Sequence, residues 1–320
     1  MTLFWQLVLN GLVAGALYAL VAVGFALIFG CTRHFHIAHA GVLATGGYLC
    51  FALVDRAGLP ILLAGALAIA ASTLLGVVIL RGVYRPLERR GGEGFVLFLV
   101  SLGALILIEN TFTLWLGASS VTVDPGEALK DPIRIGSVSL TAMQIGLIVV
   151  SFAAFAALMA ILVRTSLGKD IRALAANPEL VRILGGRPDR IQTAVYALAS
   201  AIVALAGVYQ VADTGMQPGV GTNLIIFAFV AVILGGIGSV GGAFAAAMLL
   251  GLLQNVSQLV IPSEWSTSVV FVMFLALITL LPSGLATLKS RRAVVLSATA
   301  PDASLPGDAL RPATHSGEQA

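Results

Sequence analysis

Residues 164–190 of this chain have the sequence RTSLGKDIRALAANPELVRILGGRPDR, with six basic and three acidic side chains. The stretches on either side, 140–163 and 191–212, are long apolar runs without a charged residue. A helix needs about 20 apolar residues to cross the hydrocarbon core of a membrane. The pattern therefore predicts two membrane-spanning helices joined by a charged loop outside the bilayer.

The second half of this loop predicts a short, capped helix. Asn177 can accept hydrogen bonds from free N–H groups, Pro178 has no N–H to leave unpaired, and Glu179 complements the positive end of the dipole. Gly185 and Gly186 then end it. Because a helix of about two turns is unstable alone in water, we expect it to dock on a partner. The apolar side chains available for docking are Leu180, Val181, Ile183 and Leu184.

The composition indicates that the whole chain belongs in a membrane. Of its 320 residues, 58% are hydrophobic and 10% are charged, and its mean hydropathy is +1.01, whereas about a quarter of the residues of a soluble domain are charged. Nine apolar runs are candidate spans: 4–29, 37–54, 61–80, 95–116, 140–163, 191–212, 223–236, 243–261 and 267–288. The second and seventh are short, so we expect an all-α bundle of eight or nine spans with some helices broken. Residues 1–290 are expected to form one transmembrane domain, and residues 291–320 a disordered cytoplasmic tail.

The basic residues predict the orientation. If residues 164–190 face the cytoplasm, alternation of spans puts 30–36, 81–94, 235–242 and the segment after 288 on the same side. That side then holds 14 basic residues before the tail: Arg33, Arg81, Arg85, Arg89, Arg90, Arg164, Lys169, Arg172, Arg182, Arg187, Arg190, Lys289, Arg291 and Arg292. The opposite side holds Arg56, Lys130 and Arg134. Because cytoplasmic loops carry the excess of Lys and Arg, we expect an outside N-terminus and a cytoplasmic C-terminus.

The sequence has no phosphate-binding loop and no ligand pattern typical of zinc. Gly168 and Lys169 form a Gly-Lys pair, but Asp170 follows where the motif needs Ser or Thr. His34, His36 and His39 do not share one helix face at their spacing, so we expect imidazoles at an interface or a cavity rather than a metal site. The chain is therefore expected not to be an enzyme and to bind no cofactor, and any ATP would be bound by a partner.

Five polar residues within the predicted spans are candidates for a translocation path: His39, Glu109, Asn110, Gln254 and Gln258. An ionisable residue in a membrane is costly, so Glu109 either serves transport or reaches the interface from the outer third of its helix. Gln254 and Gln258 stand one turn apart, and they either join helices by hydrogen bonds or line a wet cavity. Both alternatives are open from the sequence.

Residues 235–242 contain five glycines, a density that breaks a helix. Gly235, Gly236, Gly238 and Ser239 therefore predict a tight turn or a re-entrant loop.

Several ordered motifs resemble the membrane permeases of branched-chain amino-acid ABC importers. They are Thr165-Ser166-Leu167-Gly168, Arg172 through Glu179, Leu184-Gly185, Ala206-Gly207, Leu234 through Ser239, and Leu281-Pro282-Ser283-Gly284. The opening of the chain, with Asn10-Gly11-Leu12, Tyr18-Ala19-Leu20 and Gly24, is similar to the same family, as is Arg85-Pro86-Leu87. The resemblance extends to about residue 288.

The resemblance implies a half-permease of the bacterial inner membrane. It would pair with a second related permease, two cytoplasmic ATPase subunits and an extracytoplasmic binding protein, within the lipid bilayer and without nucleic acid. The helix after Asn177 would be a coupling helix in a groove of the ATPase, with Arg172 and Arg182 reaching acidic groups at the rim. The expected coupling residues are Arg172, Asn177, Pro178, Glu179, Leu180, Val181, Arg182, Ile183, Leu184 and Gly185.

One stretch departs from the family pattern. Members carry Asn-Phe-Ala-His-Gly after the first helix, and this chain has His36-Ile37-Ala38-His39-Ala40. The resemblance thus implies import, by alternating access, of branched-chain amino acids or of a related small amino-acid-like, amide or carboxylate solute. The alternative hypothesis is a self-sufficient ion-coupled transporter or channel for a small polar solute.

Overall fold

The computed structural model describes residues 2–136 and 138–280, and most of them are helical. In chain order the elements are α1 (Thr2–Thr32), α2 (His39–Asp55), α3 (Ile61–Val78), the π-helix η1 (Ile79–Tyr84), α4 (Arg85–Arg89), α5 (Gly94–Leu116), α6 (Glu127–Lys130), β1 (Pro132–Ile135), β2 (Val138–Thr141), α7 (Ala142–Arg164), α8 (Ser166–Ala176), α9 (Pro178–Ile183), α10 (Pro188–Asp213), α11 (Val220–Gly235), α12 (Val240–Val256), the 3₁₀ turns η2 (Ser257–Leu259) and η3 (Ser263–Trp265), and α13 (Ser266–Leu280).

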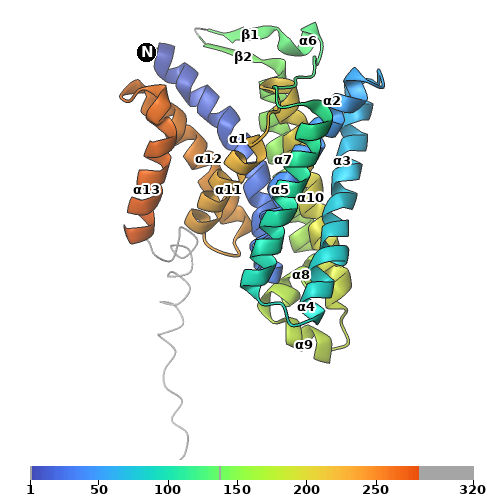
Figure 1. Cartoon of the computed structure of the whole chain (residues 1–320). Coiled ribbons are helices and arrows are strands. Elements are labelled where there is room, and N and C mark those ends of the chain that lie inside the picture. Colours follow the sequence, from blue (N-terminus) through green and yellow to red (C-terminus); the bar gives the residue numbers. More distant parts are fainter. Residues whose placement is uncertain (1, 137, 281–320) are drawn as a thin grey trace, which may run out of the picture.

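The helices form one bundle with α1 through its middle (Figure 1). α1 packs against α12, α10, α11 and α7, and α10 in turn packs against α2 and α3. α5 and α13 lie further out, against α2 and against α12 respectively. The bundle therefore has an inner set of helices around α1 and an outer set that faces away from it.

Small residues allow the inner helices to approach each other closely. A Cβ atom on residue 251 of α12 would overlap the backbone of Gly15 and lie 2.7 Å from the carbonyl oxygen of Gly11, both in α1. A Cβ on residue 207 of α10 would overlap the carbonyl oxygen of Leu43 in α2. Because lipid tails are as apolar as side chains, such close packing is a main source of helix association in membranes.

The two ends of the bundle are built differently. At the hairpin end, which contains the N-terminus, β1 and β2 form an antiparallel hairpin with Ile133 opposite Leu140. Gln6 in α1 ties the hairpin down, because its side chain donates to the Ser139 carbonyl at 2.9 Å and accepts from the Ser139 N–H at 3.0 Å. At the loop end lie α4, α8 and α9 (Figure 1). The hairpin and an isolated β-bridge between Val121 and Met216 are small additions to the expected all-α bundle.

Within residues 2–136 and 138–280, six helices are long and apolar enough to cross a membrane: 2–32, 61–89, 94–116, 142–164, 188–213 and 240–259. Three further apolar helices are shorter: 39–55, 220–235 and 263–276. The first two of these are the runs that the sequence marks as short, and they do not meet the length of a full span. The expected count of eight or nine spans is therefore not confirmed. The expected tail, 291–320, and the motif at 281–284 lie outside the described residues.

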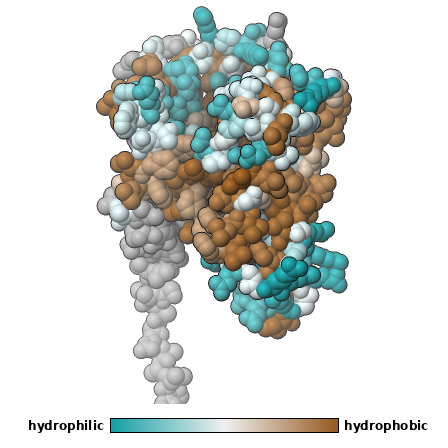
Figure 2. Space-filling model, in the orientation of Figure 1, coloured by the Kyte–Doolittle hydropathy of each residue, from teal (hydrophilic) through white to brown (hydrophobic). Residues whose placement is uncertain are grey.

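The surface has the distribution of a membrane protein. Figure 2 shows an apolar belt around the middle of the visible face, between two more polar ends. Large apolar side chains exposed on the long helices include Leu62, Leu74, Leu107, Leu114 and Val149. In water such a surface would be strongly unfavourable, and in a bilayer it contacts lipid or other membrane helices.

Candidate functional site

A cavity of about 420 Å³ opens among α1, α7, α10 and α11 near the hairpin end. Its volume lies within the range of small-molecule sites, about 300–1,000 Å³. The lining residues are Asn10, Val13, Ala14, Leu17, Tyr18, Gln144, Leu147, Tyr209, Gln210, Asp213, Thr214, Val220, Asn223, Leu224 and Phe227. The cavity thus combines an apolar interior with a small number of polar groups.

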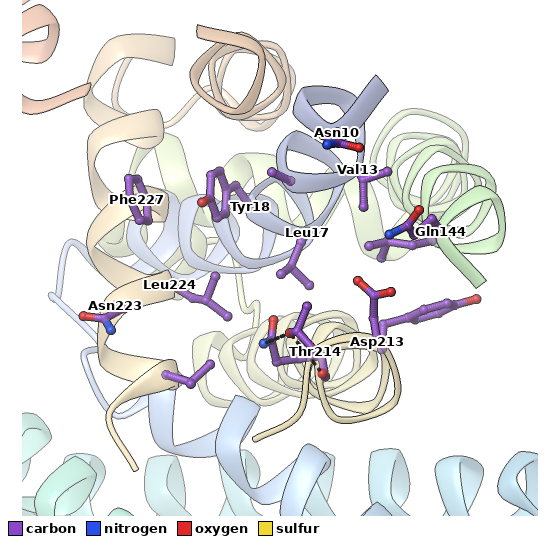
Figure 3. A pocket seen from close by; sticks show the side chains of 15 residues that line it. Asn10, Val13, Leu17, Tyr18, Gln144, Asp213, Thr214, Asn223, Leu224 and Phe227 are labelled. Atoms are coloured by element: carbon purple, nitrogen blue, oxygen red, sulfur yellow. Dashed lines mark hydrogen bonds between the residues drawn. The ribbon is translucent and has the colours of Figure 1, made fainter. Parts of the chain in front are cut away.

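The polar groups come from four helices, α1, α7, α10 and α11, near their ends. Gln144 at the start of α7 and Asp213 at the end of α10 point toward each other across the cavity (Figure 3). Gln144 is positioned by a capping box, in which Thr141 Oγ1 accepts from the Gln144 N–H and Gln144 Oε1 accepts from the Thr141 N–H, both at 3.2 Å. Gln210 donates to Thr214 Oγ1 and, at 3.2 Å, to the Gly215 carbonyl. Asp213 is therefore a single carboxylate surrounded by uncharged amides and hydroxyls.

Tyr18 forms the boundary between this cavity and α12. Its hydroxyl donates to Gln254 Oε1 at 2.7 Å, and its ring stacks on Phe227 with 4.6 Å between centroids and 11° between planes. Gln254 itself does not line the cavity. The sequence allowed Gln254 either to join helices by a hydrogen bond or to line a wet cavity. In the structure it forms the hydrogen bond between helices, directly behind the cavity wall that Tyr18 provides.

His39 lies in the core of the bundle, away from this cavity. Its side chain is fully buried, and Gly24 in α1 leaves the space for it, because a Cβ there would lie 2.8 Å from His39 Nε2. His36, also buried, shares a hydrogen bond of 2.8 Å with the hydroxyl of Tyr84, which donates to Ser101 Oγ at 2.8 Å. Burial lowers the pKa of His36 well below its ordinary value of 6.5, so its ring is neutral.

The three histidines are not brought together as metal ligands. His34 lies apart from the buried pair, with its Nδ1 at 3.4 Å from Glu88 Oε1. No group of three or more His, Cys, Asp or Glu side chains that could hold a metal ion occurs among residues 2–136 and 138–280.

The other predicted path residues are scattered. Glu109 in α5 is half-buried, and its Oε1 accepts from Thr222 Oγ1 of α11 at 3.2 Å. Asn110 is exposed and donates to the Ile106 carbonyl of its own helix. Gln258 is partly buried in η2, outside the cavity. None of the five predicted path residues lines the cavity near the hairpin end, so their roles stay predictions.

The cavity residues were missed because no single one of them is unusual in the sequence. Asp213, for example, looks like an ordinary acidic residue at the end of a span. A usable signal is present only in combination, since Asn10, Gln144, Gln210 and Asn223 each lie within about two turns of the helix terminus at the hairpin end.

At the loop end, the charged stretch forms two helices, α8 and α9, rather than one. Asn177 caps α9, because its Oδ1 accepts from the N–H groups of Glu179 and Leu180, both at 3.0 Å. Pro178 is the first residue of the helix, and Gly185 follows it with φ +79°, a conformation that favours glycine. The local prediction of a capped helix ended by Gly185 therefore agrees with the structure.

α9 presents an apolar surface away from the bundle. Leu180, Ile183 and Leu184 are 50%, 75% and 77% exposed, and Arg172 and Arg182 are exposed beside them. Val181, which the sequence grouped with these side chains, does not belong to the exposed surface. Val181 is buried and contacts the position of Gly186, so it attaches the short helix to its own chain.

The glycine-rich segment 235–242 is a tight turn between α11 and α12. Gly236 and Gly238 have φ +94° and +86°, and the Ser239 N–H donates to the Gly236 carbonyl at 3.0 Å. Ser239 then caps α12 by accepting from the Gly242 N–H at 3.0 Å. Gly235 is needed for the close approach of the two helices, because a Cβ there would overlap Gly242.

Comparison with solved structures shows the fold. A metal-chelate-type ABC transporter in an inward-facing conformation matches 87% of this chain and 86% of its own chain, with a TM-score of 0.50 and 17% identity. This similarity identifies an ABC-transporter permease fold and carries no information about the cargo.

Sequence comparison is more specific. The high-affinity branched-chain amino acid transport system permease protein BraD of Pseudomonas aeruginosa is 29% identical over 294 residues, covering 88% of this chain and 95% of the relative. LivH of Escherichia coli, a permease protein of the same type of system, is 27% identical over the same coverage. The autoinducer 2 import system permease protein LsrC of Escherichia coli is 29% identical over 188 residues, 56% of this chain and 53% of the relative. The family described as branched-chain amino acid transport system, permease component, matches residues 7–278, and this chain therefore belongs to that permease family.

Proposed function

We propose that this chain is one permease subunit of an ATP-driven importer, and that it moves branched-chain amino acids or a related small amino-acid-like solute into the cytoplasm by alternating access. The observation that carries the proposal is α9. A six-residue helix with a full N-terminal cap and three exposed apolar side chains is stable only through its attachments and is suited to a groove in another protein.

The loop end would face the cytoplasm and receive the ATPase. Leu180, Ile183 and Leu184 would enter an apolar groove, while Arg172 and Arg182 would meet acidic groups at its rim. Movement of α9 with the ATPase would be transmitted through Val181, which packs against the segment leading into α10. α10 ends at Asp213, on the cavity. One rigid helix thus connects the docking surface to the cavity.

The cavity suggests the class of solute. Asp213 is suited to a ligand ammonium group, and the amides of Gln144, Gln210 and Asn223 are suited to a carboxylate. Leu17, Leu147, Leu224 and Phe227 provide an apolar surface for an aliphatic side chain. A second permease and an extracytoplasmic binding protein would complete the path, and the binding protein would select the cargo before it reaches the cavity.

The coupling assignment is tested with the complete reconstituted complex. Leu184→Pro or Ile183→Asp is expected to abolish substrate-stimulated ATP hydrolysis while the chain still inserts and binds its permease partner. Val260→Asp is the matched control, because Val260 is 88% exposed but lies after η2 rather than on α9. Normal stimulated hydrolysis in both α9 variants would exclude the role proposed for α9.

The ion-coupled alternative depends on Glu109, a half-buried carboxylate within a predicted span. Uptake by the purified chain alone, driven by an ion gradient without an ATPase and lost in Glu109→Gln, would favour it. Under the importer proposal the isolated chain catalyses no concentrative uptake.

A further inference from the structure

A basic pocket lies at the loop end, between α4 and the beginning of α10. It has a volume of about 510 Å³, and five arginines line it: Arg85, Arg89, Arg182, Arg187 and Arg190. Two carboxylates, Glu88 and Asp189, also line it. Positive charge therefore exceeds negative charge by three within one small volume.

Only part of this charge is paired within the chain. Asp189 lies 3.9 Å from Arg85 Nε and 4.0 Å from Arg89 Nη2, and Arg85 Nη2 also donates to Thr193 Oγ1 at 2.9 Å. Arg182, Arg187 and Arg190 have no carboxylate within salt-bridge distance among residues 2–136 and 138–280. Arg85 thus holds α4 against α10, while the guanidinium groups of Arg187 and Arg190 are available to a ligand. Arg182 lies on α9, where the proposed function places the ATPase.

The start of α10 adds to the positive potential. Arg187 is its N-cap residue and makes no side-chain cap, and Pro188 follows at the first turn of this 26-residue helix. The N-terminal end of a helix of this length carries a partial positive charge, of which Asp189 in the first turn offsets a part. The pocket therefore combines side-chain charge with a backbone dipole.

The depth of the pocket suggests the source of the anion. α4 continues directly from the α3 span, and α10 is itself a membrane-crossing helix, so the pocket lies where these two spans reach the loop end of the bundle. Lipid headgroups occupy this level of a bilayer. Planar guanidinium groups bind phosphate oxygens in pairs, which a lysine cluster cannot do.

We propose that the arginine pocket binds the phosphate of an anionic phospholipid at the loop end of the bundle, and that this lipid joins α4 to the α9–α10 connection. A partner carboxylate is the less favoured occupant for Arg187 and Arg190, because α9, which carries Arg182, extends further toward the loop end than α4 does (Figure 1) and would meet a partner first. The proposal does not depend on which solute is transported.

The test uses the purified full chain in detergent and measures melting temperature and retained lipid by native mass spectrometry. Phosphatidylglycerol is expected to raise the melting temperature of the wild-type chain, and phosphatidylcholine is not. In Arg187→Gln/Arg190→Gln the rise should fall to less than about half, because both guanidinium groups available to the lipid phosphate are lost. Arg164→Gln/Lys169→Gln is the matched control, since it removes the same charge from the same loop at the end of the α7 span.

Each other outcome overturns the proposal. Equal rises in melting temperature with the two lipids, or equal losses of this rise in the two double variants, would show that general surface charge, and not the pocket, accounts for lipid binding. Protection by millimolar inorganic phosphate without lipid would assign the site to a soluble phosphate. An unchanged lipid response together with lost co-purification of the ATPase would assign the arginines to an acidic partner surface. The melting temperature without lipid, and the single variant Arg187→Gln, separate a folding defect from lost binding.

Discussion

α1 and α7 are equally plausible membrane spans by composition, yet they occupy opposite environments. In α1, 83% of the most apolar window is buried inside the bundle, whereas in α7 the share is 22%, the same as in α5. The difference shows that hydropathy detects a span but not its place in the bundle. In a bilayer, lipid tails are as apolar as a protein interior, so an exposed and a buried span have the same hydropathy requirement.

What separates the two helices is how close their neighbours come. α1 contacts backbone atoms of α12 at Gly11 and Gly15 and encloses His39 at Gly24. The glycines of α5 and α7 have looser surroundings, because a Cβ at Gly103 would meet no atom within 4 Å and one at Gly146 would only approach Tyr209, at 3.6 Å. Matched substitutions on inner and outer helices therefore test the comparison directly.

The largest effect is expected for Gly251→Leu, which forces a side chain into the backbone of α1. Backbone atoms cannot move aside as a flexible side chain can, so we expect a loss of at least about 3 kcal/mol of folding stability. Gly103→Leu on α5 should change stability by less than about 0.5 kcal/mol. Thermal melting of both purified variants measures this, and similar melting temperatures would contradict the division into inner and outer helices.

A smaller effect is expected for Gly24→Ala, which places a methyl group 2.8 Å from His39 Nε2 and 3.0 Å from the Ala199 carbonyl oxygen. His39 is fully buried, so relief requires a shift of α1 against α2, at a cost of about 1–3 kcal/mol. Gly146→Ala on α7 is the control and should be neutral or stabilising by up to about 1 kcal/mol, because alanine favours the helix. A lower melting temperature for Gly146→Ala than for Gly24→Ala would show that the close contact at Gly24 does not limit the folding stability.

Ser151 sharpens the comparison from the side of α7. It is one of the few buried residues of that helix, and its hydroxyl donates to the Ala16 carbonyl of α1 at 3.0 Å. Ser151→Ala should lower stability by about 0.6 kcal/mol, the average of interhelical hydrogen bonds in a membrane protein. Val149→Ala, at an exposed position two residues earlier in the same helix, should have no measurable effect. A larger loss in Val149→Ala than in Ser151→Ala would mean that α7 is covered by protein rather than lipid.

The smallest effect is expected outside the bundle, at Lys130. A hydrogen bond from Lys130 Nζ, 3.0 Å from Asp124 Oδ1, together with the Gly126 N–H lowers the pKa of Asp124 below its ordinary value of 3.8. A carboxyl group with a lowered pKa stabilises the folded state above about pH 4 and loses that contribution as pH falls through the folded value. Lys130→Ala should therefore lower the melting temperature slightly at pH 7 and not at pH 3. An equal loss at both values would contradict the ion pair, and because both groups are exposed, added salt should remove the effect.

The sequence predicted much of this molecule where the cause is local. Asn177, Pro178 and Gly185 specify the α9 helix by hydrogen bonding and backbone conformation within a few residues, and the structure has that helix. Gly235, Gly236, Gly238 and Ser239 specify the α11–α12 turn for the same reason. By contrast, the apolar residues of α9 could not be sorted into exposed and buried ones, because Val181 is distinguished from Ile183 only by the segment that folds back onto it.

The candidate residues of the translocation path show most clearly what the sequence alone could not predict. Glu109 stands out in the sequence because charge is rare in a span, but its partner, Thr222, is 113 residues away. Asp213 and Gln144 meet at the cavity only because α7 and α10 end on the same side of α1. Polar residues near helix ends are common in membrane proteins, so nothing in one sequence marks these as a set.

The sequence by itself determined that the chain is a membrane helix bundle, where its long apolar helices lie and which short helix is capped, because hydropathy and capping act over one helix or one turn. Its ordered motifs also indicated the permease family. Only the tertiary structure decided that α1 is central and α7 peripheral, that Val181 faces inward, and that amide side chains from four helices line one cavity with Asp213. These depend on which backbones approach closely, and close approach is a property of pairs of helices, not of either sequence alone.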